Sequence, residues 1–154
     1  MPRDHHYAVR IRWTGDRGTG TSGYRDYSRA NVLTAAGKHD IDGSADRTFH
    51  GDAGRWNPEE LLLAALSECH MLSYLHVATR NGVVVTGYTD EPTAVLRQEG
   101  DGGAIVSATL RPVVTVSDGD TDLAQRLHEE ASRLCFIATS VAFPVQHEPR
   151  VVRA

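Results

Sequence analysis

The chain is poor in cysteine and has no excess of positive charge, and each of these features excludes a class of protein. Its only two cysteines, Cys69 and Cys135, lie far apart and form no CxxC pair. A disulfide framework needs more cysteines, and a structural zinc site needs its cysteines at the close spacing of paired ligands. The formal net charge of -4 gives no general attraction to phosphate backbones or anionic lipid. We therefore expect no nucleic-acid partner and no membrane-surface partner.

The sequence also lacks a secretory signal and a membrane span. Residues 1–10 are polar and charged where a signal peptide has an apolar core, and no apolar stretch approaches the ~20 residues of a membrane span. We therefore expect a cytoplasmic protein. Neither HExxH nor CxxC occurs, and His128-Glu129-Glu130 lacks a second histidine at helical spacing, so we expect no metal and no cofactor.

The chain does contain enough apolar residues to form a core. Hydrophobic residues make up 40% of its 154 residues, which suits one compact domain over residues 1–154. Alternating apolar residues predict a half-buried strand over Tyr7–Trp13, followed by a turn over 14–23 and weaker strands over 24–33 and around Ile41. We expect these segments to form an N-terminal antiparallel β-meander.

A long central helix is predicted over residues 58–80. Asn57 is a favourable N-cap, and Glu60 three residues later completes the pattern of a capping box. Gly82 allows the left-handed conformation that commonly ends a helix. No charged residue occurs over 61–67, so we expect this half of the helix to be buried on all sides.

The second half of the chain repeats the order of strands followed by a helix. Apolar and β-branched runs predict a second antiparallel meander over residues 83–88, 94–98 and 104–116. A second helix fits residues 122–135, and residues 143–152 suit a last edge strand. The order predicts an α+β fold with helices packed on antiparallel sheet. Because few short strands are available to cover an uncharged helix, we expect a second copy of the chain to cover it.

Cys69, near the middle of the long helix, is the sharpest candidate for chemistry. Composition alone favours inert cysteines of the core, because free cysteine is among the most buried residue types. A reactive thiol needs a cation or a hydrogen-bond donor that favours the thiolate. Glu59 lies ten residues before Cys69 on the same helix, a rise of ~15 Å that exceeds side-chain reach. Glu59 can therefore assist Cys69 only across a subunit boundary, and otherwise it is a first-turn acid facing the helix dipole.

Three features follow one another along the chain: the motif NPEEL at Asn57–Leu61, a leucine-rich stretch leading into Cys69, and Cys135 within LCFIATSV. Together they resemble the OsmC/Ohr family of osmotically inducible and organic hydroperoxide resistance proteins. The resemblance spans nearly the whole chain and implies an intertwined homodimer. It also implies a peroxidase that reduces organic hydroperoxides, in which Cys69 attacks the peroxide and Cys135 resolves the sulfenic acid to a disulfide. The implied reductant is a small dithiol or a protein thiol.

The family pairs its glutamate, which Glu59 matches, with an arginine whose position in this sequence is open. The candidates are Arg17, Arg25, Arg29 and Arg47. We favour Arg29, because Tyr27 and Arg29 share one face of a predicted strand. The alternative for each of these arginines is a solvated surface charge.

Two residues depart from the family pattern. Phe136 follows Cys135 where the family usually has proline, so we expect a different turn around the resolving thiol. His70 directly follows Cys69, and adjacent helical residues point ~100° apart, so His70 is not a simple base for its neighbour. A positive charge on His70 would still favour the thiolate, whereas the commoner role of such a histidine is that of a hydrogen-bonded core residue.

Two other functions stay open at this point. A hot-dog-type acyl thioesterase would use Glu59 or Glu60 as the base on another helix-and-sheet fold, but it leaves both cysteines unexplained. A non-catalytic dimer that binds an apolar small molecule would make the thiols part of the core. In either case, peroxide added to the reduced protein would not consume thiols, whereas the peroxidase would consume them.

Overall fold

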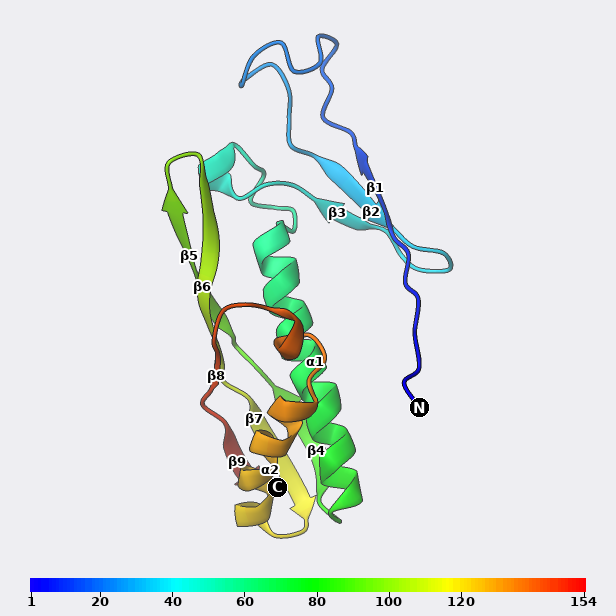
Figure 1. Cartoon of the computed structure of the whole chain (residues 1–154), viewed down its shortest axis with the longest axis vertical. Helices are drawn as coiled ribbons and strands as arrows, with labels where there is room; N and C mark the ends of the chain where they lie inside the picture. The colour runs from blue at the N-terminus through cyan, green and yellow to red at the C-terminus, as the bar shows by residue number, and fades with distance from the viewer. The chain divides into compact units, whose positions relative to one another are not determined.

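The computed structural model describes residues 1–154, which divide into two compact units, residues 1–61 and residues 62–154 (Figure 1). The boundary lies near the start of the long helix α1 (Pro58–Arg80), so this helix begins in the first unit and continues in the second. Three strands precede α1, four strands lie between the two α-helices, and two strands follow α2, an order that confirms the predicted α+β class.

The first unit is built on a three-stranded antiparallel sheet in the order β1-β2-β3. Strand β1 (Arg10–Trp13) pairs with β2 (Asn31–Thr34), and β2 pairs with β3 (Ile41–Gly43). The predicted N-terminal meander is therefore confirmed. Strand β2 begins later than predicted, however, and Arg29 precedes it.

Strand β1 lacks the buried face that its alternating sequence predicts. Tyr7 and Val9 precede the strand, and every residue within it is exposed, with Ile11 at 57% and Trp13 at 44%. The prediction of a half-buried strand is therefore wrong for the single chain. The apolar side chains of β1 are left without a cover.

Helix α1 begins and ends where the local signals predict. The backbone N–H of Glu60 donates to the Asn57 side chain at 2.8 Å, and the Glu60 carboxylate accepts from the Asn57 N–H at 3.3 Å. These two bonds form the predicted capping box. At the other end Gly82 adopts a φ of 69°, and the N–H of Val83 donates to the carbonyl of Ala78 at 3.0 Å. The left-handed conformation of Gly82 turns the chain so that the Val83 N–H can bond to a carbonyl of the last turn, and the helix ends there.

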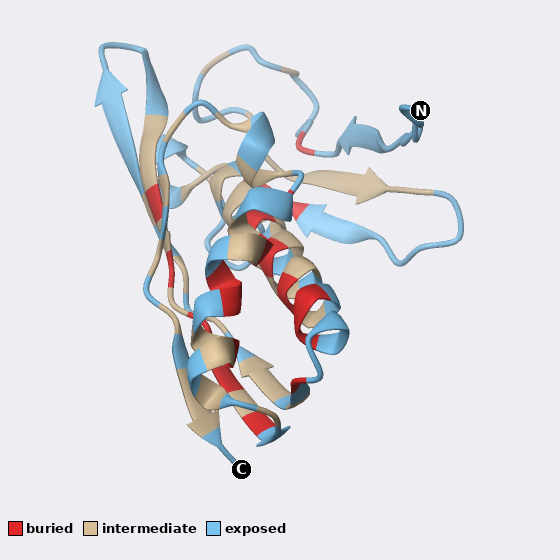
Figure 2. Ribbon diagram, turned by 60° about the horizontal axis from the view of Figure 1, so that its bottom comes forward, coloured by how far each residue is buried: buried red, intermediate tan, exposed pale blue.

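Only one stripe of α1 is buried, so the prediction of burial on all sides is wrong for the single chain. The buried residues recur at helical spacing and form a band along α1 (Figure 2): Leu66, His70, Tyr74, Val77 and Ala78. Leu72, on another face, is 55% exposed. By length and composition α1 could span a membrane, a test that the core helix of a globular protein also passes. Only 28% of its most apolar window is buried, so α1 presents apolar surface that one chain does not cover.

The second unit contains two sheets where a single meander was predicted. Strand β4 (Val84–Thr89) pairs with β7 (Val113–Asp118), and β5 (Thr93–Glu99) pairs with β6 (Gly102–Leu110), both antiparallel. The run predicted over 104–116 is divided between β6 and β7. Pro112 lies at the break, where its missing N–H cannot continue a ladder.

The C-terminal segment adds a third strand to each of these sheets. Strand β8 (Val145–His147) runs parallel to β6, and β9 (Arg150–Arg153) runs parallel to β7. One edge strand was predicted here, and Pro149 lies between the two that form. The sheet orders are therefore β4-β7-β9 and β5-β6-β8.

Helix α2 (Thr121–Leu134) packs with α1 on the sheet that contains β7. The side chain of Asp120 caps its first turn, accepting from the N–H groups of Asp122 and Leu123. The main core joins both helices to this sheet through buried residues that include Tyr74, Val114 and Leu127. A smaller core surrounds Leu66, Ala108 and Leu110. These two cores hold α1 and the end of α2 in place in the second unit.

Candidate functional site

Cys69 and Cys135 lie near each other in the second unit. Cys69 is on α1 and half-buried, whereas Cys135 follows the last residue of α2 and is 1% exposed. The two side chains are close enough for a hydrogen bond between the thiols, and both thiols are free. The fold therefore brings together the two cysteines that the sequence places far apart.

The surroundings of Cys135 hold its thiol in the protonated form. Burial raises the pKa of Cys135 to about 11, opposed by a hydrogen bond from the Ala138 N–H to Sγ at 3.4 Å and reinforced by the neighbouring Cys69. A buried, protonated thiol is a poor nucleophile for a substrate that arrives from solution. Cys69 is the more accessible of the two thiols.

A short 3-10 helix, η2 (Ala138–Ser140), forms the turn after Cys135. The hydroxyl of Ser140 donates to the carbonyl of Phe136 at 2.7 Å, and the N–H of Thr139 donates to the carbonyl of Cys135 at 3.2 Å. This turn lies where the sequence departs from the family pattern. It directs the Ala138 N–H toward the Cys135 sulfur.

A mostly apolar groove of about 380 Å³ opens beside Cys69. One wall is a single face of α1, because Cys69, Leu72, Ser73 and His76 recur at helical spacing. Leu134 and Phe136, at the end of α2, line the other side. The groove can therefore receive an apolar group next to the accessible thiol.

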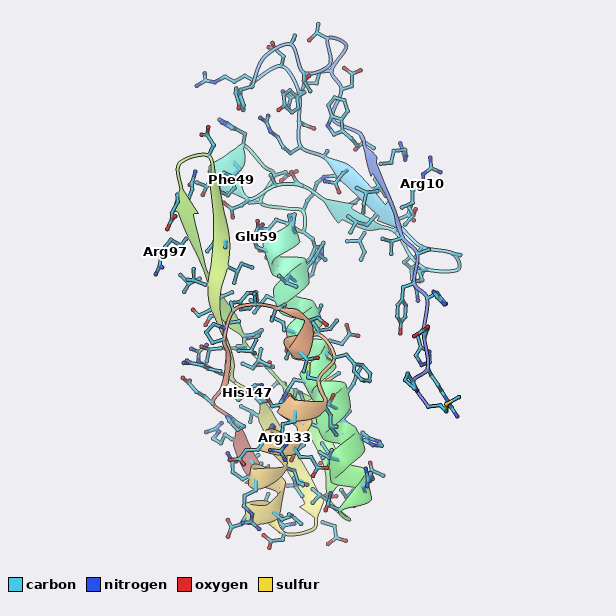
Figure 3. All side chains as sticks on the ribbon, viewed as in Figure 1. Arg10, Phe49, Glu59, Arg97, Arg133 and His147 are labelled. Carbon is cyan, nitrogen blue, oxygen red and sulfur yellow. The ribbon has the colours of Figure 1, made fainter.

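Arg29 and Glu59 line one pocket of about 340 Å³ in the first unit. The Arg29 guanidinium lies over the Tyr27 ring, 4.1 Å from its centroid, and donates to the backbone carbonyls of Tyr24 and Tyr27 at 2.7 and 3.0 Å. No ion pair within 4 Å joins Arg29 to Glu59, since the ion pairs of the structure involve Arg55 and Arg111. Figure 3 labels Glu59 at the start of α1.

The reason for choosing Arg29 was wrong in one respect, because Tyr27 and Arg29 lie before β2 and not on a strand. Arg29 is held in place by stacking on Tyr27 and by its hydrogen bonds to two backbone carbonyls, and not by a place on a strand. The other candidates do not line this pocket. Arg17 donates to the carbonyl of Arg25 at 3.2 Å, and Arg47 begins the short helix η1 (Arg47–Phe49).

His70 is a buried, hydrogen-bonded core residue. Its Nε2 lies 3.0 Å from Nδ1 of His128, and its ring packs against His147 with centroids 4.5 Å apart. Burial and the neighbouring histidines lower the pKa of His70 to about 3, so the imidazole is neutral at neutral pH. A neutral imidazole does not supply the positive charge that would favour the Cys69 thiolate.

The cluster around His70 was missed by the sequence interpretation. The Tyr74 ring stacks on His128 with centroids 4.0 Å apart, and the Tyr74 hydroxyl donates to the carbonyl of Ala124 at 3.0 Å. Its members come from α1, α2 and β8, so no local pattern connects them. No group of three or more His, Cys, Asp or Glu side chains is arranged to hold a metal ion.

Comparison with known proteins finds relatives that cover most of the chain. Residues 50–150 match the family model described as OsmC-like protein. A solved OsmC-like protein of unknown function from Vibrio cholerae O1 is 29% identical, with a TM-score of 0.85, over 95% of this chain and 99% of that chain. The uncharacterized protein YmaD of Bacillus subtilis is 25% identical over 145 residues, which are 90% of this chain and 87% of YmaD.

A more distant structure is the organic hydroperoxide resistance protein OhrB of Bacillus subtilis. It is 21% identical, with a TM-score of 0.59, over 95% of this chain and 98% of OhrB. At this identity the likeness shows the fold alone.

Proposed function

Because the chain belongs to the OsmC-like family, we propose that it is a cytoplasmic thiol peroxidase that reduces organic hydroperoxides through Cys69 and Cys135. The observation that carries the proposal is the closeness of an accessible and a buried thiol beside an apolar groove. The name of the related OhrB, an organic hydroperoxide resistance protein, supports the same class of substrate.

In the first step the Cys69 thiolate attacks the terminal oxygen of the O–O bond, the one that carries the hydrogen. The S–O bond forms as the O–O bond breaks, the alkoxide takes up a proton, and the products are an alcohol and Cys69 sulfenic acid. In the second step the Cys135 sulfur displaces hydroxide from that sulfenic acid, and water and a disulfide result. A small dithiol or a protein thiol then reduces the disulfide by exchange and is itself oxidised.

The environment of each thiol supports this order. Cys135 is buried and its pKa is raised to about 11, so it reacts poorly with a peroxide in solution. A sulfenic acid on the adjacent Cys69 is within its reach. The apolar groove favours an alkyl or aryl hydroperoxide over hydrogen peroxide, because burial of the organic group adds hydrophobic binding energy.

We further propose that the active protein is a homodimer in which Arg29 and Glu59 assist the Cys69 of the other subunit. Glu59 and Cys69 are ten residues apart on α1, ~15 Å along its axis, so one chain cannot join them directly. The incompletely buried α1 and the uncovered β1 support a second copy as the cover. In this proposal the guanidinium of Arg29 stabilises the thiolate and the developing alkoxide. Glu59 lines the same pocket and makes no ion pair with Arg29 in the single chain, so its orienting contact with the guanidinium forms in the dimer.

The proposal is tested with the reduced protein and one equivalent of cumene hydroperoxide. We expect wild type to lose both thiols and to form one intramolecular Cys69–Cys135 disulfide, detected by mass spectrometry after proteolysis. Cys69→Ser should be inactive, and Cys135→Ser should turn over once and stop as a sulfenic acid that dimedone traps. Multiple-turnover activity in Cys69→Ser would refute the assignment.

The role of Glu59 is tested separately from the fold. We expect Glu59→Gln to lower the second-order rate constant for peroxide by about tenfold or more, because the arginine loses a charged orienting partner. Glu91→Gln, which changes an exposed acid outside both sites, is the matched control. If Glu59→Gln reacts at the wild-type rate and only the melting temperature changes, Glu59 is a first-turn acid of α1.

Of the other functions, a dimer that binds an apolar molecule without chemistry remains a testable alternative because the groove suits such a molecule. That function predicts unchanged thiol content after peroxide addition. The thioesterase hypothesis depended on a hot-dog fold, and the fold is instead similar to that of an OsmC-like protein.

A further inference from the structure

A second cavity lies away from the cysteine groove, between α2 and the C-terminal segment that includes β8. Its volume is about 570 Å³, within the range of small-molecule sites. It is lined by Arg126, His128, Glu129 and Arg133 of α2 and by His147 and Pro149 from the C-terminal segment. Figure 3 labels Arg133 and His147, which come from these two elements.

The rim of this cavity carries two unpaired guanidinium groups. Arg126 and Arg133 are seven residues apart on α2 and therefore lie on one face, ~10 Å apart along the axis. Neither makes an ion pair or a side-chain hydrogen bond within the chain, although Glu129 lies between them on the same face. The lining residues include two guanidiniums and one carboxylate, and Asp120 also lies close enough to Arg126 to interact with its charge. A guanidinium binds carboxylate and phosphate through paired N–H donors.

Two histidines of the cavity have a buried nitrogen without a partner. His128 is 3% exposed, and its Nε2 makes no hydrogen bond. Nε2 of His147 is likewise buried and unpaired. An unsatisfied buried polar atom is destabilising, so a hydrogen-bond partner for either nitrogen would be stabilising. Neither nitrogen is in contact with solvent, so a ligand oxygen reaches Nε2 of His128 only when the side chains that cover it move aside.

The protonation of His128 determines which kind of ligand fits. A neutral imidazole has one donor and one acceptor nitrogen, and His128 already uses Nδ1 toward Nε2 of His70 at 3.0 Å. If His70 donates in this bond, Nε2 of His128 carries the proton and is a donor. A ligand oxygen that accepts from Nε2 selects this arrangement.

We propose that this cavity binds a small oxyanion, a molecule with a carboxylate or phosphate group, which Arg126 and Arg133 attract and to which His128 Nε2 donates. Binding fixes the His70–His128 hydrogen bond in one direction and leaves Nδ1 of His70 as an acceptor. Since His70 directly follows Cys69 on α1, the occupied site sets the tautomer of the residue next to the accessible thiol. The site does not depend on the proposed peroxidase activity.

The test is titration calorimetry of the reduced wild-type protein with inorganic phosphate and, in a separate arm, with succinate. We expect saturable binding of one of the two anions, which also identifies the favoured group. The Arg126→Gln/Arg133→Gln double variant should bind that anion about tenfold more weakly or worse. Arg97→Gln, an exposed arginine on β5, is the matched control and should bind within about twofold of wild type.

A second measurement separates this site from a diffuse surface attraction. In ¹⁵N spectra of the histidine rings, the bound anion should shift Nε2 of His128 toward the protonated form and Nδ1 of His70 toward the unprotonated form, while exposed His39 stays unchanged. The absence of saturable binding of either anion would overturn the proposal. So would full binding by the double variant, or binding that leaves the His128 signal unmoved.

Discussion

Acid should destabilise this protein in a pH range set by its buried histidines. Burial, followed by neighbouring histidines, lowers the pKa of His70 to about 3 and of His128 to about 4, and burial also lowers the pKa of His147, opposed by Asp90. These imidazoles are neutral in the folded chain, whereas in the unfolded chain they take up protons below an ordinary pKa of 6.5. The free energy of unfolding must therefore fall as the pH drops below 6.5, and the fall levels off near pH 3 to 4.

The size of this effect follows from the pKa shifts. Between pH 7 and pH 5, the unfolded state gains about 2 kcal/mol per histidine from protonation that the folded state does not match. His70 and His128 together give about 4 kcal/mol, a large part of the 5–15 kcal/mol that stabilises a typical domain. Carboxylates contribute little in this range, because an ordinary aspartate titrates near 4.

The assay is urea unfolding followed by circular dichroism at pH 7 and pH 5, at one fixed protein concentration. We expect a His70→Gln/His128→Gln double variant to lose most of the pH dependence, whatever its absolute stability. His76→Gln, which changes an exposed histidine on the same helix, should keep it. A wild-type free energy of unfolding that changes by less than about 1 kcal/mol between the two pH values would refute the reasoning.

Three further predictions concern single residues. Asn57→Ala should lower the stability of the protein by about 1 kcal/mol in thermal unfolding, because the first turn of α1 loses its cap, and an unchanged melting temperature would contradict that role. Leu110→Ala should cost about 2–5 kcal/mol in urea unfolding because Leu110 is fully buried in the smaller core, and a cost below 1 kcal/mol would mean that the site collapses without a cavity. Iodoacetamide should alkylate Cys69 well before Cys135, which is buried and has a raised pKa, and equal labelling rates by mass spectrometry would show that Cys135 opens to solvent.

Local signals in the sequence were enough to predict α1, because its cap, its first turn and its glycine stop lie within a few residues of the bonds they make. The sheets were harder to predict. The pairing of β4 with β7, and of β8 with β6, depends on contacts between distant segments that no local pattern encodes. The break at Pro112 did have a local signal, which the continuous apolar run concealed.

The candidate site also has a part that the sequence predicts and a part that depends on contacts between distant segments. The spacing of NPEEL and the two cysteines was informative because it matches a family, and the structure brings the two thiols close together. The histidine cluster could not be predicted from single-sequence patterns. Its members belong to α1, α2 and β8, and their burial follows from the packing of those three elements.

The parallel pairing of β8 and β9 has a consequence for synthesis of the chain on the ribosome. Both sheets of the second unit receive their third strand from residues 145–153, after every other strand has been made. Until that segment leaves the exit tunnel, β6 and β7 each present an unpaired edge, a common starting point for misassociation. A nascent chain from which only residues 145–153 have yet to leave the tunnel should therefore recruit chaperones, and emergence of those nine residues should end that requirement.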